Sequence, residues 1–435
     1  MEFELDTGNT AWLITASSLV LLMTPGLAFF YGGMVRGKSV LNMMMMSFAS
    51  LGVAGLIWVV YGYGLVFGSS DWFLGGFIGN PAGTFGLTLD NAASPTTDFG
   101  IPALVFAGFQ ATFAIITVAL ISGAIADRVK FGTWIVFSAI WVTIVYTPLA
   151  HWVWGGGMFG ADGWLASVLS LPIDFAGGTV VHINAGAAAL ALALVVGKRK
   201  GFGTEAMRPH NLPFVMLGAG LLWFGWFGFN AGSELAADGT AGRAWVNTLV
   251  ATGVAMLAWM VTEKFRDGAA TSLGAASGVV AGLVAVTPAA GTVDSWGAIV
   301  IGLVAGVLCS LAVGLKYRFG YDDSLDVVGV HLVGGLVGTV LIGLLATNGR
   351  YDSFYFEGSL NGIFYGGGVT QLITQVVAAL IAVVYSFVVT YVIATVLKAT
   401  MGWRVSEEAE VSGVDLAVHG ETAYENSGST ITEVR

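Results

Sequence analysis

The chain has 435 residues, of which 56% are hydrophobic and only 10% are charged. Soluble domains carry about 25% charged residues, so this composition excludes a soluble globular protein and indicates one domain embedded largely in lipid. The net charge of −10 argues against a nucleic-acid partner, and a single cysteine, Cys309, excludes a disulfide framework or a cysteine-based metal site.

Long apolar segments follow one another along the chain, each near the length of about 20 residues that spans a bilayer as a helix. We therefore predict an all-α polytopic membrane protein with eleven transmembrane helices. The eleventh is long for one crossing. The predicted helices cover Thr10–Gly32, Leu41–Gly68, Phe99–Ala126, Phe131–Ala150, Asp174–Gly197, Leu212–Gly232, Ala244–Thr262, Thr271–Pro288, Ser295–Leu315, Asp326–Ala346 and Gly362–Leu397.

The basic residues alternate between the loops in the way that the positive-inside rule requires. Of the 17 Lys and Arg residues, only Arg243 and Arg350 lie in loops after even-numbered helices. The rule then places the N-terminus outside and the C-terminus in the cytoplasm. We expect a multi-pass protein of the cell membrane, with a membrane domain over residues 1–397 and a cytoplasmic regulatory tail over residues 398–435.

Two histidines lie inside predicted helices, where an ionisable side chain is a candidate for function. His182 lies eight residues after Asp174, which opens the fifth helix, and His331 lies five residues after Asp326, which opens the tenth. The two helices run in opposite directions, so the imidazoles can meet near the middle of the membrane. The repeated order of Asp, His and a Gly-rich run indicates an inverted repeat of helices one to five and six to ten.

Each of these residues also has a purely structural interpretation. A single membrane histidine is as often an interhelical hydrogen-bonding residue as a pathway residue, but two in matched positions favour a shared pore. Asp174 and Asp326 are each placed as an N-cap that accepts helix N–H groups, and we favour that role for both. Trp154, beside three glycines, is either an interface anchor or a surface that holds a cation against its ring.

Five longer motifs follow one another along nearly the whole chain: TPGLAFFYGGMVR, HWVWGGG, DFAGGTVVHINAG, GWFGFNAGS and DVVGVHLVGG. Together they resemble the ammonium transporter family (Amt/Mep, relatives of the Rh proteins), and its Amt type in particular. The resemblance implies a homotrimer in which each subunit has its own narrow hydrophobic pore. It also implies a transporter that is not an enzyme and that needs no cofactor or metal.

The motif match implies pore roles for four residues. His182 and His331 correspond to the family's paired pore histidines, and Phe113 with Phe229 corresponds to its stacked phenylalanine gate. The paired histidines lack a neighbouring nucleophile, metal-binding carboxylates or a cofactor motif, which argues against an intramembrane enzyme.

The resemblance also implies an outer site that recruits the ammonium ion. Trp154, Ser233 and Phe113 match this site, and Asp174 matches the aspartate below it. The stretch between Trp154 and Asp174 is longer than in bacterial members of the family, so Trp164 stays an alternative to Trp154. Residues expected to support the pore are Phe109, Trp226, Asn230 and Asp326.

These assignments predict an ammonium transporter that deprotonates the recruited ion and conducts NH3, with net proton or charge movement. Potassium has no proton to lose and is excluded, whereas methylammonium is an expected substrate. Two alternatives stay open: an ammonium sensor that signals through its tail, and an electroneutral, Rh-like channel for NH3. The tail segment VSGVDLAVHGETAY resembles the family's cytoplasmic tail, which implies a PII-type signal protein as a partner.

Overall fold

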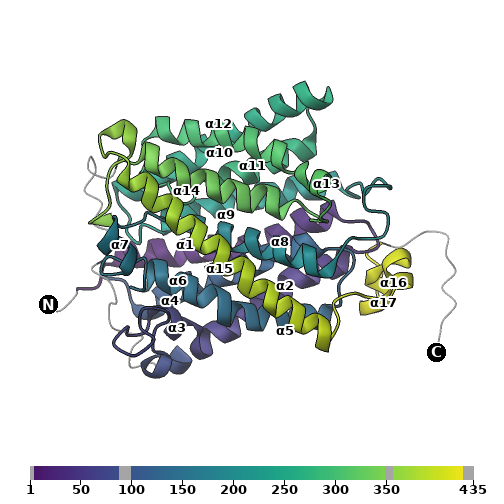
Figure 1. The fold of residues 1–435 in the computed structure, drawn as a ribbon, viewed down its shortest axis with the longest axis horizontal. Helices are drawn as coiled ribbons and strands as arrows, with labels where there is room; N and C mark the ends of the chain where they lie inside the picture. Colours follow the sequence, from purple (N-terminus) through teal and green to yellow (C-terminus); the bar gives the residue numbers. More distant parts are fainter. Residues whose placement is uncertain (1–3, 88–98, 348–355, 425–435) are drawn as a thin grey trace.

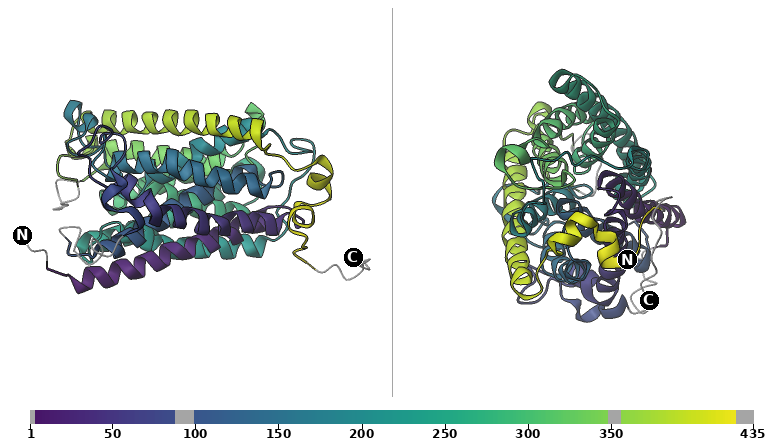
Figure 2. Two further views of the ribbon diagram at one scale, coloured as in Figure 1. Left: turned by 90° about the horizontal axis from the view of Figure 1, so that it is seen from below. Right: turned by 90° about the vertical axis from the view of Figure 1, so that its right-hand side faces the viewer.

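The structure is a computed structural model, and it describes residues 4–87, 99–347 and 356–424. The chain folds into one bundle of long helices, as predicted (Figure 1). The N-terminus and the C-terminal tail lie at opposite ends of this bundle (Figure 2), which we call the N-terminal end and the C-terminal end. Arg350, one of the basic residues in the charge pattern, lies outside the described residues. The last part of the predicted tail, residues 425–435, also lies outside them.

Ten helical segments of the described part are long and apolar enough to cross a membrane. Several of them consist of α-helix joined without a break to a π-helical or 3-10 turn. The segments are α1 (Thr7–Met34), α2–η1–α3 (Val40–Phe67), α4–η5 (Ala103–Ile125), α5–η6–α6 (Phe131–Trp154), η7–α8 (Gly178–Val196), α9 (Leu212–Gly232), α10 (Gly239–Asp267), α12–α13 (Ser295–Phe319), η8–α14 (Val328–Leu345) and α15 (Thr370–Thr400).

The eighth predicted helix is present as α11 (Ser272–Val286), but its 15 residues are too few to span a bilayer. Its second half, from Gly278 to Val286, is buried against neighbouring helices, and the chain continues in buried turns to Val293. The apolar composition of this segment therefore reflects burial inside the protein. The predicted order of eleven helices is confirmed, with one of them shorter than a membrane crossing.

Small residues allow the helix backbones to pack closely. A side chain on Gly218 of α9 would lie 2.3 Å from the backbone nitrogen of Phe30 on α1. A side chain on Gly302 of α12 would lie 2.4 Å from the carbonyl oxygen of Ala251 on α10. Such contacts supply packing between helices where lipid offers no hydrophobic driving force.

The C-terminal tail folds back across the C-terminal end of the bundle as α16 (Glu407–Ser412) and α17 (Val414–His419) (Figure 2). The Asp415 carboxylate accepts hydrogen bonds from the N–H groups of Leu41 and Asn42, at 3.0 and 2.8 Å, and so caps the first turn of α2 (Val40–Ile57). Buried Glu410 pairs with Arg404. The tail thus contacts the membrane helices directly. The division of the chain into a membrane domain that ends at residue 397 and a separate regulatory tail stays a prediction.

Candidate functional site

The two predicted histidines meet in the middle of the bundle. Their Nδ1 atoms lie 3.2 Å apart, and His182 and His331 are only 1% and 3% exposed. A hydrogen bond between two Nδ1 atoms needs one donor and one acceptor. In the neutral pair, one Nε2 therefore carries a hydrogen and the other a lone pair. Among the described residues, Nε2 of His182 has no hydrogen-bond partner.

Each histidine lies on a π-helical turn, His182 on η7 (Gly178–Ile183) and His331 on η8 (Val328–Leu332). Such turns widen a helix locally and occur frequently at functional sites. The turn η7 lies in the first half of the chain and η8 in the second. Each half therefore has a histidine on a π-helical turn, which agrees with the predicted repeat of two related halves.

Asp174 caps the first of these turns. Its Oδ1 accepts hydrogen bonds from the N–H groups of Gly177 and Gly178, at 2.8 and 2.6 Å, and its Oδ2 accepts from Thr179 and Val180, at 2.8 and 3.2 Å. Four backbone donors at a helix start fix the position of the Asp174 carboxyl group. The predicted capping role of Asp174 is confirmed.

The same prediction for Asp326 is wrong. Asp323 caps the second turn instead, because its carboxylate accepts from the N–H groups of Val327 and Val328, at 3.1 and 2.7 Å. Asp326 has a φ of 64° and pairs with Lys316 through a 2.7 Å contact between Oδ1 and Nζ.

A signal for Asp323 was present in the sequence, since it precedes His331 by the same eight residues that separate Asp174 from His182. Burial and the nearby Asp326 raise the pKa of Asp323 to about 6.

An aromatic column leads from the N-terminal end of the bundle to the histidines. The rings of Phe113 and Phe229 lie against each other with their centroids 4.2 Å apart and their planes tilted by 31°, and both are buried. Trp154 contacts Phe113 edge-on at 6.0 Å, and its Nε1 donates to the Asp174 carbonyl at 3.1 Å. Trp164, by contrast, is 52% exposed at the start of α7 (Trp164–Val168). The structure therefore brings Trp154 to the gate.

The supporting residues extend this column. Trp226 stacks on His182 with a centroid distance of 5.4 Å, and its Nε1 donates to the Thr287 hydroxyl at 2.8 Å. Phe109 packs edge-on against Phe113 at 4.9 Å. The Asn230 side chain donates to Thr248.

Ser233 follows the gate at the end of α9. Its hydroxyl donates to the Phe229 carbonyl at 2.8 Å, so both oxygen lone pairs can accept hydrogen bonds from a bound cation.

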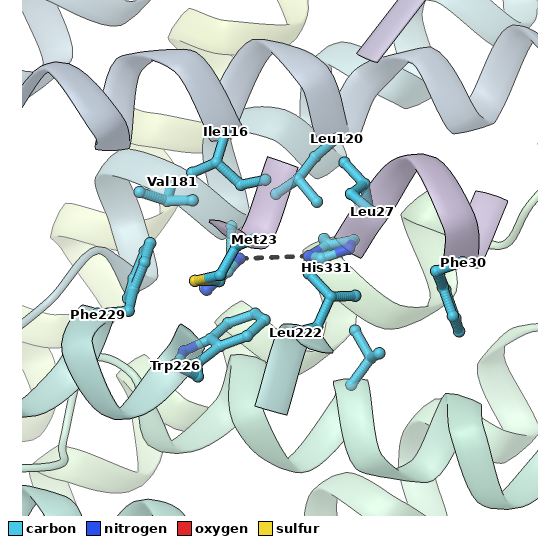
Figure 3. A pocket seen from close by; sticks show the side chains of 12 residues that line it. Met23, Leu27, Phe30, Ile116, Leu120, Val181, Leu222, Trp226, Phe229 and His331 are labelled. Atoms are coloured by element: carbon cyan, nitrogen blue, oxygen red, sulfur yellow. Dashed lines mark hydrogen bonds between the residues drawn. The ribbon is translucent and has the colours of Figure 1, made fainter. Parts of the chain in front are cut away.

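Two small cavities meet at His331. The first lies between Phe229 and His331 and has almost entirely apolar walls (Figure 3). The second continues from His331 towards Asp326 at the C-terminal end. A small uncharged molecule that passed the gate would meet only the two imidazoles as polar groups in the first cavity. Residues that line the first cavity include Met23, Leu27, Ile116, Leu120, Val181 and Leu222.

Comparisons with known proteins agree with this geometry. Residues 11–424 match the model of the Ammonium Transporter Family. An ammonium transporter from Mycobacterium tuberculosis is 56% identical, over 97% of this chain and 91% of that protein. One from Aquifex aeolicus is 50% identical, over 97% of this chain and 95% of that protein. The crystal structure of Mep2 from Candida albicans superposes with a TM-score of 0.85 and 35% identity, over 97% of this chain and 91% of that chain.

Proposed function

Because the chain belongs to the ammonium transporter family, and so is a multi-pass transporter of ammonium and not an enzyme, we propose that it admits only uncharged NH3 to its pore. The observation that carries this proposal is the contact between His182 and His331 inside an apolar cavity. An unpaired cation there would lose its hydration without a counter-charge, at a cost of many kcal/mol.

Recruitment of the ion takes place at the N-terminal end, which faces the outside. The basic residues Arg36, Lys38 and Lys200 contact the tail at the opposite end, and the positive-inside rule assigns that end to the cytoplasm. Trp154 offers its ring face to the cation, and Ser233 accepts one of its N–H groups. Asp174 places a negative charge beneath this site while it holds the start of η7.

The phenylalanine gate then separates the ion from the pore. The contacting rings of Phe113 and Phe229 form an apolar barrier in which the ammonium ion is far less stable than NH3. The ion gives up a proton to water at the outer mouth, and the resulting NH3 passes. Beyond the gate, the histidine pair offers one N–H group and one lone pair, so it can both donate to NH3 and accept from it in place of water.

Selectivity follows from the deprotonation step. Potassium is similar in size to ammonium but has no proton to lose, so it reaches the gate only as a cation. Methylammonium can lose a proton and is therefore a substrate. We further propose that the released proton also crosses, passed along the hydrogen bond between His182 and His331 and not carried as a free cation, which makes transport electrogenic.

The test is to measure ammonium-evoked currents in proteoliposomes, against potassium and methylammonium, with His182→Ala as the control variant. A transient current with ammonium and methylammonium, and none with potassium, supports electrogenic and selective transport. A change of internal pH without current would support the electroneutral NH3 channel. A potassium current equal to the ammonium current would contradict the pore mechanism.

The remaining partners are proposals from the resemblance. We propose a homotrimer, which native mass spectrometry in detergent tests directly. We also propose that a PII-type protein binds at the C-terminal end, where the tail contacts the helices. Ammonium-dependent binding at the tail without any flux would favour the sensor alternative.

A further inference from the structure

A polar side chain on α15 holds the backbone that leads into Asp174. Gln375 is fully buried on a helix whose other inward-facing residues are mostly small or apolar. Its amide oxygen accepts from the Ile173 N–H at 2.7 Å, and its amide nitrogen donates to the Ile173 carbonyl at 2.8 Å. This two-point contact fixes the residue directly before Asp174.

The rest of the Gln375 amide is also engaged. Its nitrogen donates to the Thr339 carbonyl on α14 (Val333–Leu345) at 3.2 Å, and its oxygen accepts from the Gln371 amide at 3.2 Å. A primary amide has two donor hydrogens and two acceptor lone pairs, so its capacity is filled. The reversed amide would place its oxygen against two carbonyl groups, so only one orientation fits.

The backbone at Ile173 sets the position of the next residue, Asp174, which makes two sets of contacts at the outer site. The backbone carbonyl of Asp174 accepts a hydrogen bond from the indole N–H of Trp154, at 3.1 Å. Its carboxylate holds the first N–H groups of η7, the turn that carries His182. A shift of the backbone at Ile173 would therefore move the Trp154 ring and the start of η7 together.

A second contact from α15 reaches the other end of η7. Ser386 lies eleven residues after Gln375, about three helical turns further along the same side of the helix. Its hydroxyl donates to the Asn184 side chain at 2.6 Å, and Asn184 in turn donates to the Val180 carbonyl at 3.1 Å. Helix α15 thus contacts the chain on both sides of η7, at Ile173 before it and at Asn184 after it.

We propose that Gln375 is a positioning residue for ammonium recruitment, which sets the place of Asp174 and of the Trp154 ring through the Ile173 backbone. The hydrogen bonds of Gln375 go to Ile173, Thr339 and Gln371, so it acts on the recruitment site through these neighbours. The inference rests on the proposed function, because it assigns recruitment to Trp154.

The test compares Gln375→Met with Gln371→Met. Methionine keeps the length and flexibility of glutamine but removes its strong hydrogen bonds. Gln371 is equally buried and also makes four hydrogen bonds, one of them to Gln375 itself, but its backbone partners are Leu171 and Leu360, which lie further along the chain from Asp174. Both variants are measured in proteoliposomes for ammonium-evoked current over a concentration series, and in detergent for thermal unfolding.

Gln375→Met is expected to raise the half-saturating ammonium concentration about tenfold, with a smaller change in the maximum current. Gln371→Met is expected to lower the Tm to a similar extent but to leave the half-saturating concentration near the wild-type value. If Gln375→Met does not fold, Gln375→Asn, whose amide is too short to reach Ile173, should show the same shift.

An unchanged half-saturating concentration in Gln375→Met, or an equal shift in both variants, would overturn the positioning role while wild-type transport stood. A wild-type protein that gave no ammonium signal at all would overturn the proposed function first, and the positioning role with it.

Discussion

Nδ1 of His182 and Nδ1 of His331 lie 3.2 Å apart although 149 residues separate them in the chain. The contact needs one hydrogen between the two rings, which makes the tautomers of the pair interdependent. Trp226 stacks on His182 from one side and restricts the ring further. The pair is thus a fixed hydrogen-bonding unit in an apolar cavity.

A charge in this unit should relax the exclusion of potassium. We expect His182→Asp to conduct potassium at about one tenth of its ammonium current or more, because a fixed carboxylate offsets the desolvation of a cation. Potassium-evoked current in proteoliposomes measures this. His182→Asn, a neutral polar substitution of similar size, is the control and should still exclude potassium. Complete exclusion by the Asp variant would place the filter elsewhere in the pore.

The sequence was sufficient to predict the helices and the histidine pair, because apolar length and rare ionisable residues are strong signals in a membrane protein. It did not identify Asp323 as the second cap. Three aspartates, Asp322, Asp323 and Asp326, lie close together before the tenth helix, and the exact helix start decides which of them caps it.

Gln375 escaped prediction for a different physical reason. A neutral amide in an apolar segment gives no charge signal, and its partners Ile173 and Thr339 are backbone groups far away in the sequence. The length of α11 was also overestimated, since burial against protein and burial in lipid require the same apolar residues.

Trp154 should govern the affinity for ammonium. We expect Trp154→Leu to raise the half-saturating concentration about 3- to 30-fold, the range that corresponds to loss of a cation–π contact, with little change in the maximum current. The measurement is a concentration series of ammonium-evoked current. Trp164→Leu is the matched control, since this tryptophan is exposed on α7 and should leave the curve unchanged. A larger effect at Trp164 would reverse the assignment.

The two capping aspartates should differ in their contribution to stability. Asp174→Ala leaves four backbone N–H groups without their acceptor, whereas Asp323→Ala leaves two. Losing a helix cap typically lowers the free energy of unfolding by about 1 kcal/mol, and more where the donors are buried. We expect the fall in Tm for Asp174→Ala to be about twice that for Asp323→Ala in the same detergent. Equal falls would show that the carboxylate contacts do not determine stability here.

Glu234, next to Ser233 at the N-terminal end, should make stability depend on pH. It is only 4% exposed, and its Oε2 has no hydrogen-bond partner among the described residues. Burial, and then Asp238, raise the pKa of Glu234 to about 8, although Arg243 opposes this shift. The folded protein therefore binds this proton more tightly than the unfolded chain, so its stability falls as the pH rises from the ordinary range of a carboxyl group through about 8.

Glu234→Gln removes this titration and should raise the Tm relative to wild type, by little at pH 5 and by several degrees at pH 8.5. Thermal unfolding in detergent at both pH values measures the difference. Glu205→Gln is the control, because Glu205 is exposed near the opposite end of the bundle and its substitution should change the Tm equally at both pH values. A difference between Glu234→Gln and wild type that did not grow with pH would contradict a titration of Glu234 between pH 5 and pH 8.5 in the folded protein.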